Sequence, residues 1–361
     1  MYDLIVIGGG PAGSAAAITA TRSGARVLLL ERGRFPRHKV CGEFVSAESL
    51  GLLADLLGPQ PSPLLQEAIC ISHGRFFAGG QTLRFTIAPA AASITRLDLD
   101  AALWSSAEKQ GVEARQQVAV EKILGTGPFR VLTSQGTYEA RALINASGRW
   151  SNLSAPPPKT QEKWIGLKAH FAESQPAQSV DLYFFEGGYC GMQPVRSLAD
   201  KEESLVDVCT MVRADVASSF PEVFNLHPGL LERSKRWQLF SKPVSTSPLV
   251  FQTPTPVRDG ILLVGDAAGF VDPFVGDGIS MALRGGALAA ECLTPFLRRN
   301  VVYAEVLRQY AGAYEKSFST VFRTSARIRW GLQLPAWVRK PVLFFLEKNP
   351  SLAQYLMEQT R

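Results

Sequence analysis

The beginning of this chain constrains its fold more than any other stretch. The apolar run Leu4–Ile7 is typical of a buried parallel strand, and it stops at the motif Gly8-Gly9-Gly10-Pro11-Ala12-Gly13. In this spacing the first glycine permits a tight turn, the second lets a pyrophosphate approach the backbone, and the third lets a helix pack against the strand. The start of that helix offers free N–H groups to phosphate oxygens. The motif therefore predicts a dinucleotide-binding loop.

A second apolar run supports this interpretation. It covers residues 25–30 and ends in Glu31-Arg32. An acid at the tip of the second strand is where the ribose of an adenine dinucleotide is held. Strand, glycine loop, helix, strand and acid follow one another in order, which disfavours the alternative of a glycine-rich turn in some other α/β domain.

Cysteine usage and charge restrict the class of protein further. The five cysteines are scattered, odd in number and without CxxC pairs. This argues against a metal site or a disulfide framework and for a reducing cytosol. The net charge of +6 allows an anionic substrate or a membrane surface. Since the sequence has no nucleic-acid motif, we expect a cytoplasmic enzyme, with contact at the inner face of the membrane as the alternative.

A second glycine-rich region lies far from the first. The apolar run Ile261–Val264 ends in Gly265-Asp266, and Gly276-Asp277-Gly278-Ile279 then starts a helix that we expect to reach Leu297. An acid at a strand tip can hold a ribose or ribityl hydroxyl, and a glycine-rich helix start can face the partial negative charge of a reduced flavin. The two motifs together predict that both ends of the chain bind one cofactor.

These motifs resemble those of a known family. The N-terminal glycines, Arg96 before a helix, Gly265-Asp266-Ala267-Ala268 and Gly276-x-Gly278-Ile279 are similar to the FAD motifs of glutathione-reductase-like flavoproteins of the p-hydroxybenzoate hydroxylase branch. Within that branch the chain resembles the geranylgeranyl reductase subgroup. Three motifs carry this finer resemblance: Pro36-Arg37-x-Lys39-x-Cys41-Gly42-Glu43, Ile165-Gly166-Leu167-Lys168-Ala169-His170-Phe171 and Gly188-Tyr189-x-Gly191. The resemblance covers roughly residues 1–300.

The resemblance implies a role for each matched residue. Glu31, with Arg32 beside it, would bind the adenosine ribose, and Arg96 would lie near the pyrophosphate or ribityl chain. Asp266 would hold the ribityl or pyrophosphate, and Gly278-Ile279 would cap the pyrimidine edge of the flavin. The cofactor-binding residues expected are Gly8, Gly10, Pro11, Ala12, Gly13, Glu31, Arg32, Cys41, Gly42, Arg96, Gly265, Asp266, Gly276, Gly278 and Ile279.

Two residues are candidates for a catalytic role. Cys41 would lie beside the isoalloxazine ring; the alternative is a buried small residue in a turn. Tyr189 would line the substrate pocket or simply pack in the sheet. His170 is interpreted as a hydrogen-bonded sheet residue rather than a general acid.

The electron donor is a separate question. Ala146-Ser147-Gly148 stands where the family has Asp-Gly, a motif linked to both FAD and NAD(P)H contacts. Ser147 cannot supply that charge, so NADPH or NADH is expected only as a transient donor, with another donor as the alternative.

Two reactions remain open for such a flavoprotein. One is reduction of a carbon–carbon double bond in an isoprenoid or lipid-like substrate. The other is monooxygenation of an aromatic, quinone or polyketide-like substrate through a flavin C4a-hydroperoxide. Halogenation ranks last because the Trp-x-Trp-x-Ile-Pro signature is absent. An electron-transfer or flavin-binding scaffold is disfavoured by the dedicated substrate domain.

The predicted fold is α/β, with a glutathione-reductase-like FAD-binding Rossmann domain, an inserted mixed or antiparallel substrate domain and C-terminal helices. The FAD-binding domain would comprise residues 1–75, 95–155 and 250–300, with a proline-rich hinge at 155–158. Residues 76–94 and 156–249 would bind the substrate, and 301–361 would be helical. Aromatic residues and arginines interleave at 322–330, 334–340 and 342–346. Helices of this kind suit an anionic lipid surface or pack over the flavin domain with a solvated basic face.

Overall fold

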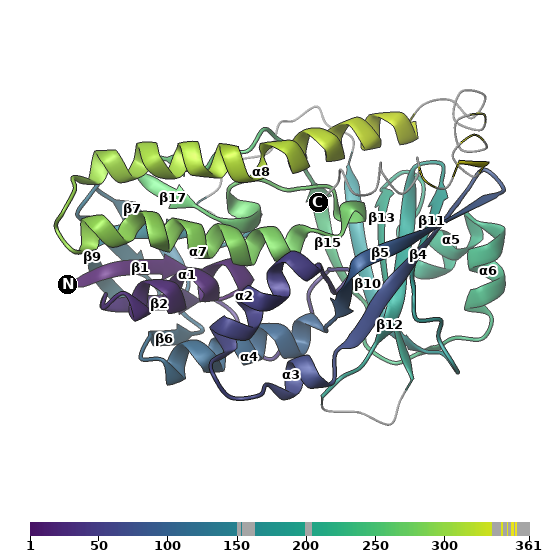
Figure 1. Cartoon of the computed structure of the whole chain (residues 1–361), viewed down its shortest axis with the longest axis horizontal. Coiled ribbons are helices and arrows are strands. Elements are labelled where there is room, and N and C mark those ends of the chain that lie inside the picture. The colour runs from purple at the N-terminus through teal and green to yellow at the C-terminus, as the bar shows by residue number, and fades with distance from the viewer. Residues whose placement is uncertain are drawn as a thin grey trace.

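The computed structural model describes residues 1–149, 153, 163–198, 204–333, 341, 345, 348, 349 and 351. The proline-rich hinge at 155–158 and, except for Phe345, the C-terminal segments at 334–340 and 342–346 lie outside these residues. Two layers of β-sheet stand side by side along the long axis of the described chain, and helices cover the first of them (Figure 1).

The first sheet assembles strands from separate parts of the chain. Its order is β16-β17-β9-β1-β2-β6, with the β7–β8 hairpin paired to β9. The strands β17, β9, β1, β2 and β6 are mutually parallel, as expected for a doubly wound domain. The bounds are β1 Tyr2–Ile7, β2 Val27–Glu31, β6 Glu113–Gln116, β7 Val120–Leu124, β8 Phe129–Thr133, β9 Gly136–Asn145, β16 Val257–Arg258 and β17 Ile261–Leu263.

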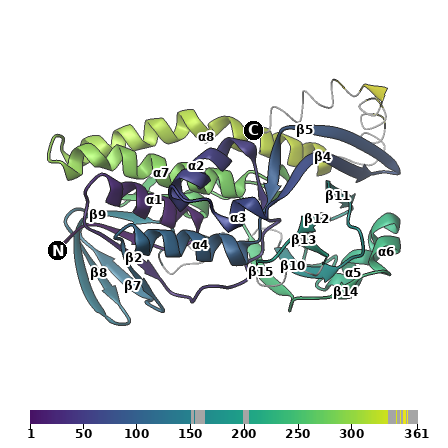
Figure 2. The same ribbon diagram turned by 60° about the horizontal axis from the view of Figure 1, so that its bottom comes forward.

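The helices on this sheet bring the two glycine-rich regions into contact. A Cβ on Gly286 would lie only 2.1 Å from the backbone oxygen of Ala12, so α7 and α1 cross with almost no side chain between them. Both views show α1 beside α7 and α8 beyond it (Figures 1 and 2). The bounds are α1 Pro11–Arg22, α2 Ala47–Leu57, α3 Pro63–Gln66, α4 Arg96–Lys109, α7 Gly278–Leu297 and α8 Tyr303–Gln333.

The long helix α8 packs over the first sheet and its helices along one stripe of side chains. Its buried side chains recur every three or four residues and join the same core as α1 and α7. The hydroxyl of Tyr310 also donates a hydrogen bond of 2.7 Å to the carbonyl of Leu263. The stripe consists of Val306, Tyr310, Tyr314, Phe318 and Val321. Among the helices described, none combines the length and apolar character needed to cross a membrane.

The second sheet has the order β14-β10-β13-β12-β11-β4-β5-β3, with β15 on β10. Only β11 and β4 pair in parallel; the other pairs are antiparallel. The expected mixed sheet and the overall fold class are therefore confirmed. The bounds are β3 Phe44–Val45, β4 Ile69–Ala78, β5 Gln81–Ser93, β10 Trp164–Ala172, β11 Val180–Phe185, β12 Gly188–Val195, β13 Leu205–Arg213, β14 Gln238–Leu239 and β15 Val244–Leu249.

Side chains alternate between the two faces of this sheet. Leu167, Ala169 and Phe171 of β10 pack with α5 (Phe220–Asn225) and α6 (Pro228–Ser234). Lys168 and His170, one position along in each case, point to the opposite face, where they meet the loop before β3. Helix α5 begins at Phe220, after residues 214–219 have formed turns that end in the Ser219 capping box.

One expected boundary lies elsewhere in the structure. The predicted FAD-binding segment ran to residue 75, but β4 belongs entirely to the second sheet from Ile69 onward. β4 pairs with β5 from Ile69 to Ala78, and residues 74–77 also pair with β11 on the other side. The division of the chain into three parts otherwise stays a prediction.

Candidate functional site

The carboxyl ends of the three parallel strands β9, β1 and β17 lie together at one edge of the first sheet, which we call the crest. The N–H of Ala146, after β9, donates to the carbonyl of Ile7 at 2.7 Å, and the N–H of Val264 donates to Asn145 at 3.0 Å. A Cβ on Gly265 would lie 3.1 Å from the Cβ of Ala12. The Gly265 turn therefore stands against the glycine motif at the start of the chain, and the crest is a topological binding position.

The glycine loop is shaped as a phosphate cradle. Gly8 has a φ of +104°, and a Cβ there would lie 2.3 Å from the carbonyl oxygen of Ala146. A Cβ on Gly13 would lie 1.7 Å from the oxygen of Gly8, so only glycine permits this helix–strand contact. Gly10 precedes α1 without a side-chain cap, and Pro11 occupies the first turn. The first N–H groups of the helix are therefore available to an anion.

Glu31 ends β2 directly beside this loop. Its carboxylate accepts hydrogen bonds from the N–H of Gly9 at 3.0 Å and of Gly33 at 2.7 Å. Arg37 donates to it at 2.8 Å. Burial alone would raise the pKa of Glu31, but Arg37 and the two N–H groups lower it overall. Glu31 is thus held as an oriented acceptor for a ribose, whereas Arg32 is exposed.

Arg96 links the glycine loop to the second sheet. It starts α4 after the cap Thr95, and its guanidinium makes two bonds of 2.8 Å to Asp100. A Cβ on Gly10 would lie 3.8 Å from the Arg96 Nη2, so this cation overlooks the loop. Although burial would lower it, Asp100 raises the pKa of Arg96. A fixed positive charge at this point fits a pyrophosphate.

The second glycine-rich region completes the crest. Asp266 lies in the turn η1 (Gly265–Ala267), where its half-exposed carboxylate is 3.5 Å from Arg149 Nε. After the turn η2 (Pro273–Val275), Gly276 has a φ of +77° and contacts the ring of Phe44. Gly278 is exposed at the start of α7, and Ile279 behind it is buried. The hydroxyl of Ser147 is buried and makes no hydrogen bond to any described residue. Together, Ser147 and the residues of this second glycine-rich region fit FAD.

Cys41 and Gly42 lie in the loop between the two sheets. The thiol of Cys41 accepts a long contact of 3.4 Å from the N–H of Glu43, and Gly42 is exposed. Burial raises the pKa of Cys41, while the charge of Arg96 opposes this effect. Cys41 is therefore held as a neutral thiol and not as a thiolate nucleophile.

A buried polar cluster stands next to Cys41, and sequence reasoning assigned it no role. Glu43, with a φ of 55°, is fully buried. Its carboxylate is 2.8 Å from Lys168 Nζ, 2.8 Å from His170 Nε2 and 2.8 Å from the N–H of Arg96. A non-glycine residue in the left-handed region is a conformation found at functional sites. Glu43 thereby joins the first sheet to the second beside the aromatic core described next.

An aromatic core continues from this polar cluster along the same sheet face. The ring of Tyr189 stacks on Phe184 with centroids 5.4 Å apart and meets Phe274 edge-on at 6.0 Å. Burial raises the pKa of Tyr189 well above its usual range. The side chains packed together in this aromatic core include Leu182, Phe184, Tyr189, Met211, Phe76, Phe251, Phe270 and Phe274. Tyr189 is thus part of the aromatic core, and its neutral phenol is one polar group within it.

Asp272 borders the aromatic core on the side of the crest. It is buried, its N–H donates to Ser325 of α8 at 3.3 Å, and Arg329 Nη1 lies 3.6 Å from its carboxylate. Burial raises the pKa of Asp272 to about 7, against the opposing charge of Arg329. The guanidinium of Arg329 also covers the ring of Phe251 at 3.9 Å. The C-terminal helix α8 therefore packs directly against the aromatic core.

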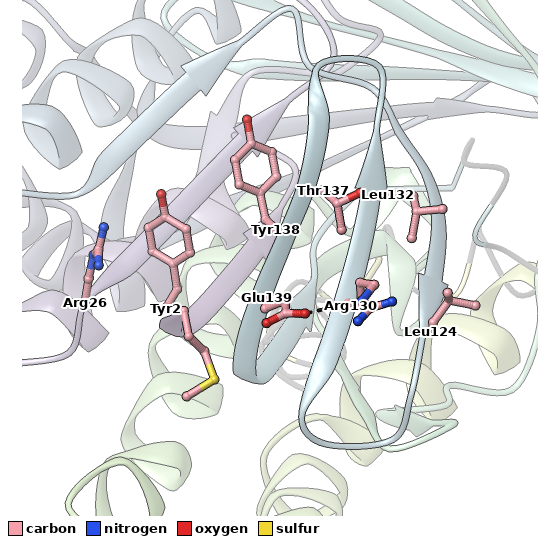
Figure 3. Close-up of a pocket in the computed structure, with 9 residues that line it drawn as sticks. Tyr2, Arg26, Leu124, Arg130, Leu132, Thr137, Tyr138 and Glu139 are labelled. Atoms are coloured by element: carbon pink, nitrogen blue, oxygen red, sulfur yellow. Dashed lines mark hydrogen bonds and ion pairs between the residues drawn. The ribbon is translucent and has the colours of Figure 1, made fainter.

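A surface hollow lies elsewhere in the described chain. It has a volume of about 740 Å³ and surrounds the amino end of β1, at Tyr2 and Arg26. In Figure 3 the rings of Tyr2 and Tyr138 and the Arg130–Glu139 ion pair border it as an open basin on the β8–β9 hairpin. The glycine loop follows the opposite end of the same strand, so this hollow is separate from the dinucleotide crest.

Comparisons with known proteins agree with the crest. A family described as FAD dependent oxidoreductase matches residues 3–36. Digeranylgeranylglycerophospholipid reductase 2 of Methanopyrus kandleri is 28% identical over 348 residues, which is 89% of this chain and 84% of that protein.

Solved structures show the same fold. The flavin-dependent brominase Bmp2 has a TM-score of 0.80 at 19% identity, covering 99% of this chain and 93% of that one. A geranylgeranyl bacteriochlorophyll reductase-like protein from Thermoplasma acidophilum has a TM-score of 0.74 at 19% identity, covering 96% and 91%. The predicted resemblance to geranylgeranyl reductase-like flavoproteins is confirmed, and the chain is an FAD-dependent oxidoreductase.

Proposed function

We propose that this oxidoreductase reduces a carbon–carbon double bond of an isoprenoid or other lipid-like substrate. The observation that supports this most is the aromatic core beside the crest, formed by side chains of the second sheet together with Phe251, Phe270 and Phe274. Aromatic and aliphatic side chains of this kind line the sites that bind apolar molecules. The lipid reductase of Methanopyrus kandleri, similar along 89% of this chain, supports the same substrate class.

The residues of the crest would hold the cofactor. The glycine loop and Arg96 would bind the pyrophosphate, Glu31 the adenosine ribose, and Asp266 the ribityl chain. FAD, when bound, supplies the hydride chemistry. The protein would position the substrate beside the aromatic core, where Phe184, Tyr189 and Phe274 exclude water, while the cluster around Glu43 keeps fixed polar groups at its end.

The electron donor is proposed to be NADPH or NADH, docking transiently. The sequence holds a single glycine fingerprint, so a separate nicotinamide domain has no candidate region. Arg149, beside Asp266 at the crest, is a partly buried cation that suits the phosphates of such a donor. If another reduced electron carrier reduces the bound flavin and neither NADPH nor NADH does, this proposal is wrong.

We further propose that the chain works at the inner face of a membrane. Near its end α8 carries Arg323, Arg327 and the exposed indole of Trp330, and Phe345 beyond it is also exposed. Arginines beside an exposed aromatic ring suit an anionic lipid surface. A lipid-like substrate would be met at the same surface.

Anaerobic reduction separates the reductase from the monooxygenase. The FAD-loaded protein is reduced by NADPH, NADH or dithionite and mixed with an isoprenoid lipid that has several double bonds. The proposal predicts reoxidation of the flavin without oxygen and a product two hydrogens heavier by mass spectrometry. A long-lived C4a-adduct absorbance on adding oxygen, with no reduced product, would instead show the monooxygenase.

A further inference from the structure

Asp207 is a buried carboxyl group that makes no hydrogen bond to any described residue. It lies on β13, between His170 of β10 and Gln193 of β12 in the sheet register. Its exposed fraction is 1%, and neither carboxyl oxygen has a hydrogen-bond partner among the residues described. The nearest cationic atoms are His170 Nε2 at 3.6 Å and Lys168 Nζ at 3.7 Å. A buried polar group in this condition requires an explanation.

The neighbouring Glu43 takes the hydrogen bonds that Asp207 lacks. Lys168 Nζ and His170 Nε2 each lie 2.8 Å from a Glu43 oxygen. Glu43, His170 and Asp207 present polar atoms that all lie within 4.8 Å of one another. Among the described residues Lys168 is the one permanent cation within 4 Å of both carboxyl groups, and the hydrogen bond of His170 goes to Glu43. Ionising Asp207 as well would place a second carboxylate in a low-dielectric interior without a hydrogen bond of its own. The arrangement therefore favours a proton on one of the two carboxyl groups.

The contacts indicate which group that is. Glu43 accepts from three donors, and its pKa is lowered to about 2 by Lys168 and His170 despite burial. Burial raises the pKa of Asp207 well above its usual range, and the charge of Glu43 raises it further. Pairs of carboxyl groups whose environments separate their pKa values in this way divide acid and base roles.

The other groups around Asp207 do not alter this assignment. Thiols and a further imidazole face the cluster, and burial raises the pKa of both thiols and lowers that of the imidazole, so that each is neutral. Gln193 donates to Ser93 at 2.7 Å, and its own oxygen accepts nothing within the described chain. These neutral neighbours are Cys41 in the loop, Cys209 on β13 and His38, whose ring stands edge-on to His170.

We propose that Asp207 is a neutral carboxylic acid at physiological pH and donates a proton to the substrate at the polar end of the aromatic core. Its role as donor rests on the proposed function. Reduction of a double bond adds a hydride to one carbon, supplied by reduced flavin, and a proton to the other. The O–H bond of Asp207 breaks, a C–H bond forms, and the electron pair remains on the carboxylate. Lys168 stabilises that carboxylate until water returns the proton.

Infrared spectroscopy tests the protonation state without any turnover. The FAD-loaded wild-type protein and the Asp207→Asn variant are compared at pH 8, above the pKa of about 7 of Asp272. We expect a carboxylic acid C=O band in the wild type that is missing from the variant. The matched control is Asp181→Asn, because Asp181 is equally buried but is held by Arg75 and Arg233. That variant should keep the band.

A second variant tests the link between the two carboxyl groups. In Glu43→Gln, Lys168 loses its carboxylate partner, so Asp207 should ionise and its band should vanish although Asp207 is still present. The urea midpoint of Asp207→Asn should match the wild type, whereas that of Asp181→Asn should fall. A wild-type spectrum without an Asp207-dependent band, or a band that persists in Glu43→Gln, would overturn the proposal.

Turnover then distinguishes the two proposals. With an isoprenoid substrate, Asp207→Asn should slow double-bond reduction by about 100-fold, with FAD content and the rate of flavin reduction by dithionite unchanged. A wild-type protein that shows the band but reduces no isoprenoid would refute the proposed function and leave the protonated Asp207 standing. Full turnover in Asp207→Asn would refute its role as donor.

Discussion

The crest of the first sheet and the polar cluster of the second are built in different ways. The crest is made mainly from backbone: Gly8 and Gly13 are needed because a Cβ at either would overlap another strand or turn. The cluster is made from side chains that lie far apart in the sequence, such as Glu43 and Lys168, whose atoms are 2.8 Å apart. A backbone site leaves a spacing in the sequence, whereas a side-chain site leaves only ordinary residue types.

The largest expected effect is on the backbone site. In Gly13→Val the new side chain would have to share space with the oxygen of Gly8, 1.7 Å from the position of its Cβ. We expect FAD affinity, measured by fluorescence titration, to fall by at least about 100-fold, because the helix start shifts away from the pyrophosphate. The control is Gly51→Ala in α2, where a Cβ meets no described atom within 4 Å.

The second effect is on the side-chain site. Lys168→Met leaves the buried carboxylate of Glu43 without its lysine, which should cost about 3–5 kcal/mol of unfolding free energy. The exposed pair Lys235–Glu232 is the comparison, and Lys235→Met should leave the free energy of unfolding almost unchanged. Urea unfolding measures both. Equal small losses would show that the cluster does not hold the two sheets together.

Acid should weaken the same cluster. The pKa of Glu43 is lowered to about 2 from 4.5, by Lys168 and His170 against the effect of burial. Its contribution to stability is therefore complete above pH 4.5 and is lost as the pH falls towards 2. The loss over this window should be larger in Asp207→Asn, which keeps Glu43, than in the double variant Glu43→Gln/Asp207→Asn, in which neither side chain can ionise. Parallel curves for the two proteins would contradict the assignment.

This contrast explains what the sequence could and could not predict. The glycine spacing, the tip acid Glu31 and the Gly265-Asp266 turn predicted the crest, because each reflects a local backbone requirement. The alternation in β10, where Lys168 and His170 stand between apolar residues, was a usable signal for a buried polar face. Nothing local connects that face to Glu43 or Asp207, since their contacts form only when the two sheets meet.

The contact between α1 and α7 tests how the ends of the chain are joined. In Gly286→Ala the new methyl group would lie 2.1 Å from the oxygen of Ala12, so the helices must separate. We expect a loss of about 2–3 kcal/mol in thermal or urea unfolding. Gly312→Ala in α8, where no described atom lies within 4 Å, should gain up to about 1 kcal/mol.

The smallest expected effect on stability concerns Asp272, which lies between the crest and the aromatic core. Because its pKa is raised to about 7 from 3.8, ionisation opposes folding, and wild-type stability should fall as the pH rises from 4 to 7. Asp272→Asn should therefore gain roughly 1–2 kcal/mol at pH 8, reduced by the lost contact with Arg329. Below pH 4 the two proteins should be equally stable. A constant difference at all pH values would refute this interpretation.

Cofactor content tests the central claim, that the two ends of the chain bind one FAD between them. The purified protein is soaked in FAD, freed of excess cofactor by gel filtration, and its bound FAD is measured by absorbance for the wild type, Gly13→Val and Asp266→Ala. The account predicts one FAD per wild-type chain, with binding strongly weakened in both variants. A wild-type protein that stays colourless, or an Asp266→Ala variant that binds FAD as tightly as the wild type, would contradict it.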